Sequence, residues 1–354
     1  MNPVDVKHNL KIEEFRMIAT DRHSPRVPLA MPFGWFQVLY SSELAIGEAK
    51  PITYFDRDLV IFRTESGAAK VIDAYCAHMG AHLGYGIREH AGSAAAVDGE
   101  NIVCPFHGWQ FNGEGQCKHI PYAKNLPPRV ARGEKVIRSY EVREINQCIL
   151  VWYHPDDIAP TYEPPVVSEA TLENDEWGEI KSFTWEISTH MQEIGENAVD
   201  AAHFHFVHGT DDIPDVQKQE FGEFTRHGLL KTRNETPRGV IEGFIENFST
   251  GPGLSVIKFS GICDTILLAN LTPVHSEHAR AMYAFMQKKV DGKTVSGGIG
   301  DAIIANICSQ MEEDIIIWNR KIYYERPLLC DGDGPFAKFR KWYGQFIPPS
   351  PAQD

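Results

Sequence analysis

Two short stretches, Cys76-Ala-His78 and Cys104-Pro-Phe-His107, decide how the first half of this chain folds. Each stretch carries one cysteine and one histidine, so a single loop can direct both side chains toward one centre. Residues 79–103 separate the two stretches, and the chain must fold back to bring the two loops together. The four side chains then form a Cys2His2 set, which is a complete set of ligands for a metal centre.

Two cofactors can use such a set, tetrahedral zinc and a Rieske [2Fe–2S] cluster. A zinc finger pairs cysteine with cysteine and histidine with histidine at short spacings. A Rieske cluster has two cysteines on one iron and two histidines on the other. Because each loop here offers one residue of each kind, each loop can serve both irons, and the pattern favours the Rieske cluster. The nearby His82 lacks this spacing and is interpreted as an ordinary polar loop residue.

The composition indicates a folded protein of two domains. The chain has 354 residues, of which 43% are hydrophobic and 23% charged, and this balance is typical of globular proteins. The net charge of -14 argues against non-specific nucleic-acid binding and against docking on anionic lipid. Seven cysteines argue against a disulfide framework and favour a reducing compartment. Since we find no signal-peptide pattern and no apolar segment of about 20 residues, we expect a cytoplasmic protein without a membrane span.

Strand and turn signals divide the chain into an N-terminal arm (1–30), a first domain (31–155) and a second domain (156–354). Short β-rich runs predict an all-β first domain, at Phe36–Tyr40, Thr53–Phe55, Leu59–Phe62, Lys70–Ile72 and Ile149–Tyr153. A proline-containing stretch from Pro155 to Pro165 marks the boundary. The second domain combines strand-like runs with helices predicted at 189–207 and 303–324, which is an α+β pattern.

A second dense group of polar residues lies between Glu196 and His208. Non-haem Fe(II) is commonly held by two histidines and one carboxylate, and His203 and His208 are the natural pair. Five residues on an ideal helix correspond to about 140° of rotation, so the helix must end or bulge between these two histidines. His205 then points elsewhere.

The third iron ligand must come from a distant part of the chain, where Glu312, Glu313 and Asp314 compete. On a helix, Asp314 and Trp318 lie on one face at positions i and i+4. Glu313 is rotated from Asp314 by about 100°. An acidic cluster of this kind also occurs on solvated helix faces, but a histidine pair that binds iron needs a carboxylate.

Both groups of residues resemble those of the Rieske-type non-haem iron oxygenases. Residues 32–154 resemble the Rieske domain, through the stretches Cys76–Gly80, Cys104–Phe111 and Ile120–Tyr122. The gap between the two ligand loops is longer than the family gap, and the excess near 89–96 is interpreted as a surface loop, whose length costs little.

The segment from Asn197 to His208 resembles the family signature N-x-x-D-x-x-H-x4-H without a gap. The resemblance implies that His203 and His208 bind iron. It also implies that Asp200 bridges this site to a Rieske histidine of a neighbouring subunit, and that Asn197 lies near the iron in a supporting role.

The segment from Asp314 to Lys321 resembles the D-x-x-x-W-x-x-K segment of steroid-active members of the family. In those members the aspartate completes the iron triad. The resemblance therefore favours Asp314 over both glutamates as the third ligand.

The resemblance implies an N-terminal all-β Rieske domain and a C-terminal helix-grip α+β catalytic domain, which assemble into rings that are commonly trimers. It implies a [2Fe–2S] cluster and a mononuclear Fe(II). Because the sequence has no G-x-G-x-x-G or P-loop motif, a separate ferredoxin or flavin reductase must supply electrons. The expected function is that of the terminal oxygenase component of a monooxygenase, which uses O2 to hydroxylate a substrate.

The expected substrate is a steroid or sterol, because the motifs are most similar to the branch of 3-ketosteroid 9α-hydroxylases and cholesterol 7-desaturases. Two alternatives within the family stay open, a sterol-methyl oxidase or demethylase and an oxygenase or O-demethylase of aromatic acids. Two alternatives from other classes are a Rieske electron-transfer protein and a zinc-stabilised binding module. Neither of these needs His203, His208 and Asp314.

Overall fold

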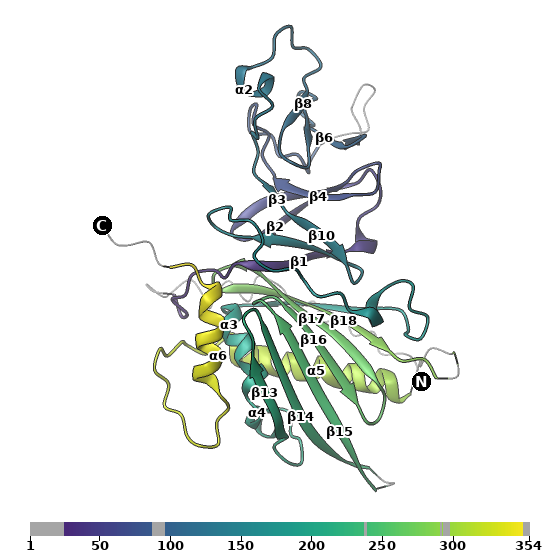
Figure 1. Cartoon of the computed structure of the whole chain (residues 1–354), viewed down its shortest axis with the longest axis vertical. Helices are drawn as coiled ribbons and strands as arrows, with labels where there is room; N and C mark the ends of the chain where they lie inside the picture. Colours follow the sequence, from purple (N-terminus) through teal and green to yellow (C-terminus); the bar gives the residue numbers. More distant parts are fainter. Residues whose placement is uncertain (1–24, 87–95, 237–238, 291, 293–297, 350–354) are drawn as a thin grey trace.

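The computed structural model of this protein describes residues 25–86, 96–236, 239–290, 292 and 298–349. In its N-terminal part, small antiparallel sheets follow one another along the long axis of the molecule (Figure 1). Their strand orders are β1-β11-β10, β2-β3-β4-β9 and β5-β6-β7-β8. The elements are β1 (Gly34–Tyr40), β2 (Ala49–Tyr54), β3 (Arg57–Arg63), β4 (Ala69–Asp73), β5 (Val97–Asp98), β6 (Asn101–Val103), β7 (Gln110–Asn112), β8 (Cys117–His119), α2 (Pro128–Ala131), β9 (Ser139–Tyr140), β10 (Val142–Ile145) and β11 (Cys148–Tyr153).

The C-terminal part is built on one large antiparallel sheet, in the order β12-β18-β17-β16-β15-β14-β13, with the long helix α5 lying across one face (Figure 1). Its elements are β12 (Lys181–Ile187), α3 (Met191–Gly195), α4 (Ala202–Phe206), β13 (Asp215–Phe221), β14 (Thr225–Thr236), β15 (Gly239–Thr250), β16 (Leu254–Ser260), β17 (Thr265–His275), β18 (His278–Gln287), α5 (Ile299–Trp318) and α6 (Phe336–Tyr343). A sheet that holds a long helix is the helix-grip arrangement, so the predicted α+β fold class is confirmed.

The strand β11 shows how the sequence produces the contact between the two parts. All six of its residues are buried, and in a strand successive side chains point to opposite faces. Ile149, Val151 and Tyr153 accordingly join one hydrophobic cluster. The alternate residues, Cys148, Leu150 and Trp152, join another.

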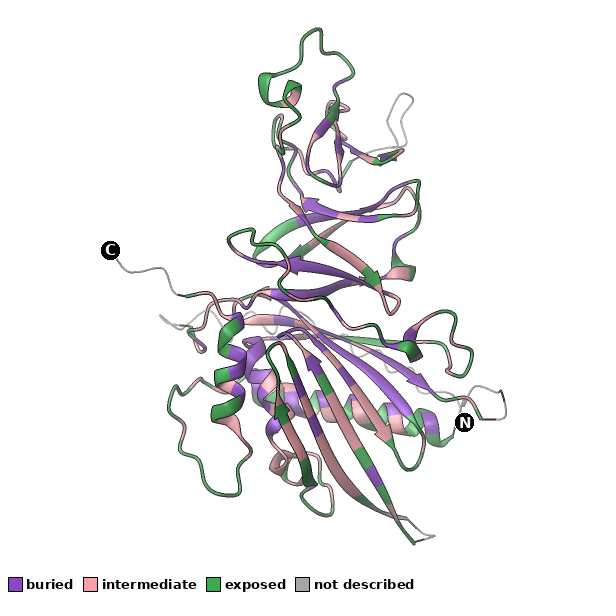
Figure 2. Ribbon diagram, in the orientation of Figure 1, coloured by how far each residue is buried: buried purple, intermediate pink, exposed green. Residues whose placement is uncertain are grey.

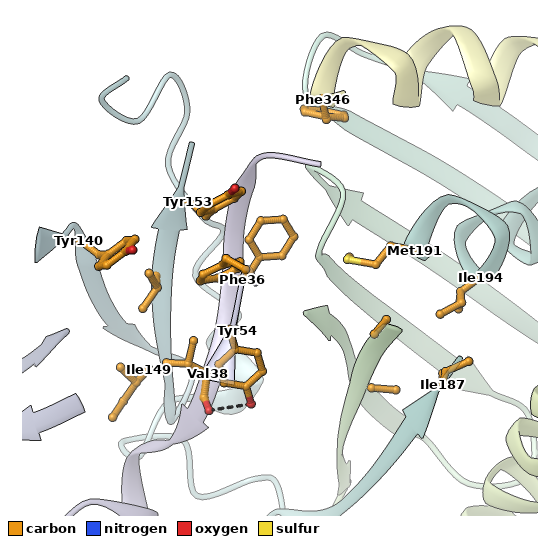
Figure 3. Packing of buried hydrophobic residues seen from close by; sticks show 14 of the residues in the cluster. Phe36, Val38, Tyr54, Tyr140, Ile149, Tyr153, Ile187, Met191, Ile194 and Phe346 are labelled. Carbon is orange, nitrogen blue, oxygen red and sulfur yellow. Dashed lines mark hydrogen bonds between the residues drawn. The ribbon is translucent and has the colours of Figure 1, made fainter. Parts of the chain in front are cut away.

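A single hydrophobic core crosses from the N-terminal to the C-terminal part. Phe36, Val38 and Tyr54 of the first part share one cluster with Ile187 and Met191 of the second (Figure 3). Burial is densest in β1 and in β17, which contacts it, and it falls off toward the edge strand β13 (Figure 2). The two parts therefore pack as one body. The predicted boundaries at residues 30 and 155 stay predictions.

The two predicted helices differ from the observed ones. The helix predicted at 303–324 begins at Ile299 and ends at Trp318. The helix predicted at 189–207 is divided into α3, a 3-10 turn (Glu196–Val199) and α4. Most of the predicted N-terminal arm and most of the surface loop near 89–96 lie outside the described residues. None of the helices in the described ranges is both long and apolar enough to span a bilayer.

Candidate functional site

The two cysteine–histidine loops have the same backbone design. In each loop the N–H of a glycine donates to the carbonyl of the cysteine four residues earlier, Gly80 to Cys76 and Gly108 to Cys104. Both glycines have φ of 72°, in the left-handed region that favours glycine. The two loops follow β4 and β6 in the outermost part of the molecule (Figure 1). The structure therefore brings together the two loops that the sequence analysis expects to meet.

The atoms in these loops fit a [2Fe–2S] cluster. Nδ1 of His78 and Nδ1 of His107 are both buried, and neither has a hydrogen-bond partner among the described residues. The two imidazole rings lie 4.8 Å apart. The Cys76 thiol donates a hydrogen bond to the Cys104 sulfur, which lowers the pKa of Cys104 to about 5. Two adjacent sulfurs and two unsatisfied ring nitrogens are the donor set of a Rieske cluster.

Two neighbouring residues have structural roles in these loops. Trp109 stacks on His78 at 4.6 Å between ring centroids, and its indole N–H donates to the Tyr122 hydroxyl over 2.8 Å. His82 uses its Nδ1 to accept a hydrogen bond from the N–H of Gly84. This hydrogen bond gives His82 a structural role within the loop, in line with its interpretation as an ordinary polar loop residue.

In the C-terminal part, the chain between Met191 and Gly209 is broken into short helical pieces. Asp200 has extended backbone angles between the 3-10 turn and α4. Helix α4 ends at Phe206, and Gly209 follows with φ of 65°. The predicted end of the helix between His203 and His208 is therefore observed, and it allows both imidazoles to face one point.

His203, His208 and Asp314 form a second group of possible metal ligands. Their ligand atoms all lie within 4.8 Å of one another. Nε2 of His208 lies 3.5 Å from Oδ2 of Asp314. Asp314 belongs to α5 and the histidines to the segment around α4, so the two distant parts of the sequence meet as predicted. His205 is not part of this cluster, and its Nδ1 donates to the Thr210 carbonyl instead.

Hydrogen bonds orient the three side chains of this cluster. Nδ1 of His203 donates to the backbone carbonyl of Asp200 over 2.7 Å, and Nδ1 of His208 donates to Oε2 of Glu313 over 2.8 Å. The amide of Asn197 donates to Oδ2 of Asp314 over 3.0 Å. Because both Nδ1 atoms are engaged as donors, the Nε2 lone pairs are left for a metal ion.

Burial sets the protonation of the cluster. It raises the pKa of Asp314 to about 6 and lowers the pKa of His203 below its ordinary value. At neutral pH the carboxyl is therefore ionised and the His203 imidazole is neutral, and these are the forms that bind metal. Two histidines and one carboxylate on one side of a centre fit non-haem Fe(II).

Two adjoining cavities give access to this cluster. An inner cavity of about 180 Å³ is lined by His203, His208 and Asp314 together with apolar side chains of the sheet. An outer cavity of about 1040 Å³ opens beside it. The residues common to both linings are Phe204, Ile245, Phe259, Ile307 and Gln310. A ligand can thus extend from the metal ligands past these mostly apolar side chains into the outer cavity, whose lining also includes charged residues such as Asp212, Lys231 and Arg233.

The structure reveals two roles that the sequence did not assign. Glu313, one of the three acids that compete for the third ligand position, accepts a hydrogen bond from Nδ1 of His208, the ring nitrogen that faces away from Asp314. Arg226 is buried on β14, and its Nη1 donates a hydrogen bond to the carbonyl of Ala198, in the segment that leads to His203 and His208. Nothing in the local sequence marks Arg226, because an arginine in a strand normally faces solvent.

Two family models match the chain. The model of the 3-ketosteroid 9alpha-hydroxylase C-terminal domain matches residues 151–347, and that of the Rieske [2Fe-2S] domain matches residues 34–141. Together they cover both candidate sites.

Curated relatives have the same two parts. A probable 3-ketosteroid-9-alpha-monooxygenase oxygenase component of Rhodococcus rhodochrous is 30% identical over 334 residues, covering 88% of this chain and 79% of the relative. A cholesterol 7-desaturase of Xenopus laevis is 29% identical over 360 residues, covering 93% of this chain and 75% of the relative.

Solved structures share the fold. Dicamba monooxygenase bound to dicamba has a TM-score of 0.67 at 17% identity, covering 90% of this chain and 98% of that chain. Pseudomonas putida CBB5 NdmA with caffeine has a TM-score of 0.68 at 18% identity, covering 88% of this chain and 89% of that chain. Members of this family carry a Rieske [2Fe–2S] cluster and a mononuclear non-haem iron, and they receive electrons from a partner reductase or ferredoxin. The two donor sets described above fit these two cofactors. The chain belongs to the Rieske-type non-haem iron oxygenases, as a terminal oxygenase component with a catalytic domain of the 3-ketosteroid 9α-hydroxylase type.

Proposed function

We propose that this protein hydroxylates a steroid or sterol in the cavity beside His203, His208 and Asp314. The observation that carries the proposal is the convergence of these three side chains in a mostly apolar inner cavity that adjoins a larger outer one. In this proposal Cys76, His78, Cys104 and His107 hold the [2Fe–2S] cluster, and the triad holds the iron. When bound, the cluster supplies single electrons, and the iron supplies open positions for O2.

The protein's own groups prepare this site in three ways. The Asp200 carbonyl and Glu313 fix the rings of His203 and His208 with Nε2 toward the metal. Asn197 holds Oδ2 of Asp314, which fixes the orientation of that carboxylate. The apolar walls exclude water, so that charges near the metal interact more strongly.

Asp200 is proposed to connect this site with the cluster of another subunit. Its Oδ1 accepts hydrogen bonds from the N–H groups of Ala202 and His203, at 2.9 and 3.3 Å. Its side chain is 28% exposed, so it can accept a further hydrogen bond from outside the chain. A histidine of a neighbouring Rieske domain is the donor in this proposal.

A homotrimer is proposed because the two sites of one chain are far apart and because the family that the sequence resembles commonly assembles as trimers. β6 lies near the top of the molecule and α4 in its lower half, so the two sites are separated along the long axis (Figure 1). The two cysteine–histidine loops carry the exposed apolar side chains Met79 and Phe106, and the exposed Tyr122 after β8 lies near His107. Docking these side chains on a second subunit would bury them and bring a cluster to the iron of that subunit.

The size of the cavities supports a large hydrophobic substrate. The inner cavity of about 180 Å³ is smaller than the roughly 300–1,000 Å³ typical of ligand pockets. A substrate must therefore extend into the outer cavity, which suits an elongated polycyclic molecule. The relatives named above act on 3-ketosteroids and cholesterol by their names, and their similarity supports the same class here.

Turnover of a substrate panel tests this function. The purified protein, reduced through a surrogate ferredoxin and reductase, is given 3-ketosteroids, sterols and aromatic acids, while oxygen uptake and products are measured. We expect oxygen uptake coupled to a steroid or sterol, with one oxygen atom added to the product. Coupling only to aromatic acids would favour the O-demethylase alternative. Loss of two hydrogens, or of a methyl group, would identify a desaturase or a demethylase.

Metal analysis separates an oxygenase from a simple carrier. We expect about three irons per chain, two in the cluster and one in the triad, with a red-brown colour and an anisotropic EPR signal after reduction. Two irons per chain would indicate a Rieske electron-transfer protein. Stoichiometric zinc without colour would indicate a zinc-stabilised binding module.

A further inference from the structure

A buried ion pair lies at the start of the turn that leads to the two histidines of the triad. Glu196 is the first residue of the 3-10 turn and has an exposed fraction of 4%. Arg340 of α6 donates from Nε to Oε1 of Glu196 over 2.6 Å and from Nη2 to Oε2 over 3.2 Å. Two such bonds between a planar guanidinium and a carboxylate fix the direction of both groups. The pair therefore determines where the Glu196 side chain lies.

Arg340 is held on its other side by the segment that follows α5. Its Nη1 donates to the carbonyl of Tyr324 over 2.6 Å. The guanidinium carbon lies 4.8 Å from the ring centroid of Tyr323, within the range of a cation–π contact. A side chain with contacts of this kind on two sides has little freedom to move. Arg340 thus links the 3-10 turn, the segment after α5 and α6.

The C-terminal part of the chain also packs directly against this turn. A Cβ on Gly195 would lie only 2.9 Å from Cζ of Phe339, which belongs to α6. A Cβ on Gly334, just before α6, would overlap the carbonyl of Val199. The backbone on both ends of the turn is therefore in close contact with α6 and the residues before it.

The next residue of the turn, Asn197, contacts the third member of the triad. Its amide donates to Oδ2 of Asp314 over 3.0 Å. A 3-10 helix has three residues per turn, so neighbouring side chains differ in direction by about 120°. Glu196 can therefore be held by α6 while Asn197 extends to Asp314. Fixing the turn at Glu196 also fixes where the Asn197 amide meets the Asp314 carboxylate.

We propose that Arg340 is a positioning residue for the iron site, which acts through Glu196 and Asn197 on the carboxylate of Asp314. This inference rests on the proposed function in one respect, that Asp314 is an iron ligand. It gives α6, which contributes no member of the triad, a part in setting the orientation of the third ligand.

Iron affinity tests the proposal. The holoenzyme and its Arg340→Met and Glu196→Gln variants are compared by competition with a chelator. We expect each substitution to lower iron affinity about tenfold, as the loss of a group that orients a metal ligand does, with the cluster absorption unchanged. The EPR signal of the ferrous site with nitric oxide, which reports the ligand geometry, should change in the same variants.

Two further variants separate the pair from its parts. The double variant Glu196→Gln/Arg340→Met leaves no unpaired buried charge, so it is the variant expected to fold if Arg340→Met does not. Because the effect passes through one pair, the double variant should lose no more affinity than the weaker of the two single variants. Arg340→Lys keeps the charge but cannot form two parallel hydrogen bonds, and we expect it to lose less affinity than Arg340→Met.

Controls on the same part of the chain distinguish positioning from general stability. Phe346 packs against Trp342 of α6 in the shared hydrophobic cluster. We expect Phe346→Leu to lower the free energy of unfolding and to leave iron affinity unchanged. Lys341 is the exposed neighbour of Arg340, and Lys341→Met should change neither quantity.

The outcomes are distinct for the two proposals. A wild type that lacks the mononuclear iron would overturn the proposed function and this inference together. A wild type that binds this iron, with equal affinity in a folded Arg340→Met or in the double variant, would overturn the role of Arg340 alone. Additive losses in the double variant, or an equal loss of affinity in Phe346→Leu, would overturn that role as well.

Discussion

Nδ1 of His208 donates a hydrogen bond to Oε2 of Glu313 over 2.8 Å, and Glu313 immediately precedes Asp314 in the helix α5. One turn of α5 therefore reaches the same histidine from two sides. Oδ2 of Asp314 lies 3.5 Å from Nε2 of His208, the ring nitrogen proposed to bind the metal, while Glu313 accepts a hydrogen bond from the opposite ring nitrogen. The rotation of about 100° between successive helical residues gives the two neighbouring acids these different tasks.

Replacing Glu313 should weaken iron binding without abolishing it. A carboxylate behind a metal-bound histidine orients the ring and raises its basicity, and its loss costs about 10- to 100-fold in metal affinity or activity. We expect this loss in Glu313→Ala, measured by competition with a chelator. Glu313→Gln retains an acceptor for Nδ1 and should lose less. If Glu313→Ala loses iron as completely as a ligand variant, Glu313 is itself a ligand.

Asp314→Ala should remove the third iron and leave the cluster intact. The two histidines alone cannot complete the triad, so we expect about two irons per chain and an unchanged cluster absorption spectrum. Glu312→Ala is the matched control, because Glu312 is exposed on the same turn of α5. Iron loss in the Glu312 variant with full iron in the Asp314 variant would reverse the assignment.

Asp200→Asn should separate electron delivery from metal binding. Asparagine keeps an oxygen that can accept from the N–H groups of Ala202 and His203, so the start of α4 and the iron content should persist. The loss of the charge should lower turnover about 100-fold and slow the reoxidation of the reduced cluster in a single turnover. Turnover equal to that of the wild type would exclude Asp200 as the bridge.

Cys104→Ser should abolish the cluster, whereas Cys117→Ser should not. Both cysteines are buried in the same hydrophobic cluster, but Cys117 lies on β8 with its thiol directed to the carbonyl of His119. We expect loss of visible absorption and of about two irons per chain in the first variant only. An intact spectrum in Cys104→Ser would remove this residue from the ligand set.

Stability should fall in mild acid because of His190. Its Nδ1 accepts from the N–H of Gln192 at the start of α3, and its Nε2 donates to the carbonyl of Ala30. Burial lowers its pKa from 6.5 to about 4. The unfolded state binds this proton more readily than the folded state. The contribution of His190 to the free energy of unfolding is therefore complete above pH 6.5 and is lost as the pH falls toward 4.

The matched variant His190→Asn isolates this effect, because asparagine can also cap a helix. The difference in the free energy of unfolding between wild type and variant, measured by denaturant titration, should shrink by about 2 kcal/mol from pH 7.5 to pH 5. A difference that stays constant over this range would show that His190 is not held neutral by the fold.

Much of the fold and the grouping of residues at both candidate metal sites could be predicted from the sequence. The cluster loops are short, and each carries its own cysteine, histidine and glycine, so their geometry is local. The end of the helix between His203 and His208 follows from helical periodicity alone. Asp314 could be named only through resemblance to the family, since three successive acids offer the same chemistry.

Only the tertiary structure determined the contacts of residues that lie on different helices and strands. The register of α5 against the α4 segment places Asp314 beside Nε2 of His208 and Glu313 beside Nδ1 of the same ring. The pairing of β13, β14 and β15 places Arg226 behind a cavity wall, although its local sequence predicts an exposed strand residue. The physical reason is that spacing along the chain determines which ligands one loop can present. The packing of the sheet against the helix determines which side chains lose water, and hence which charges require a partner.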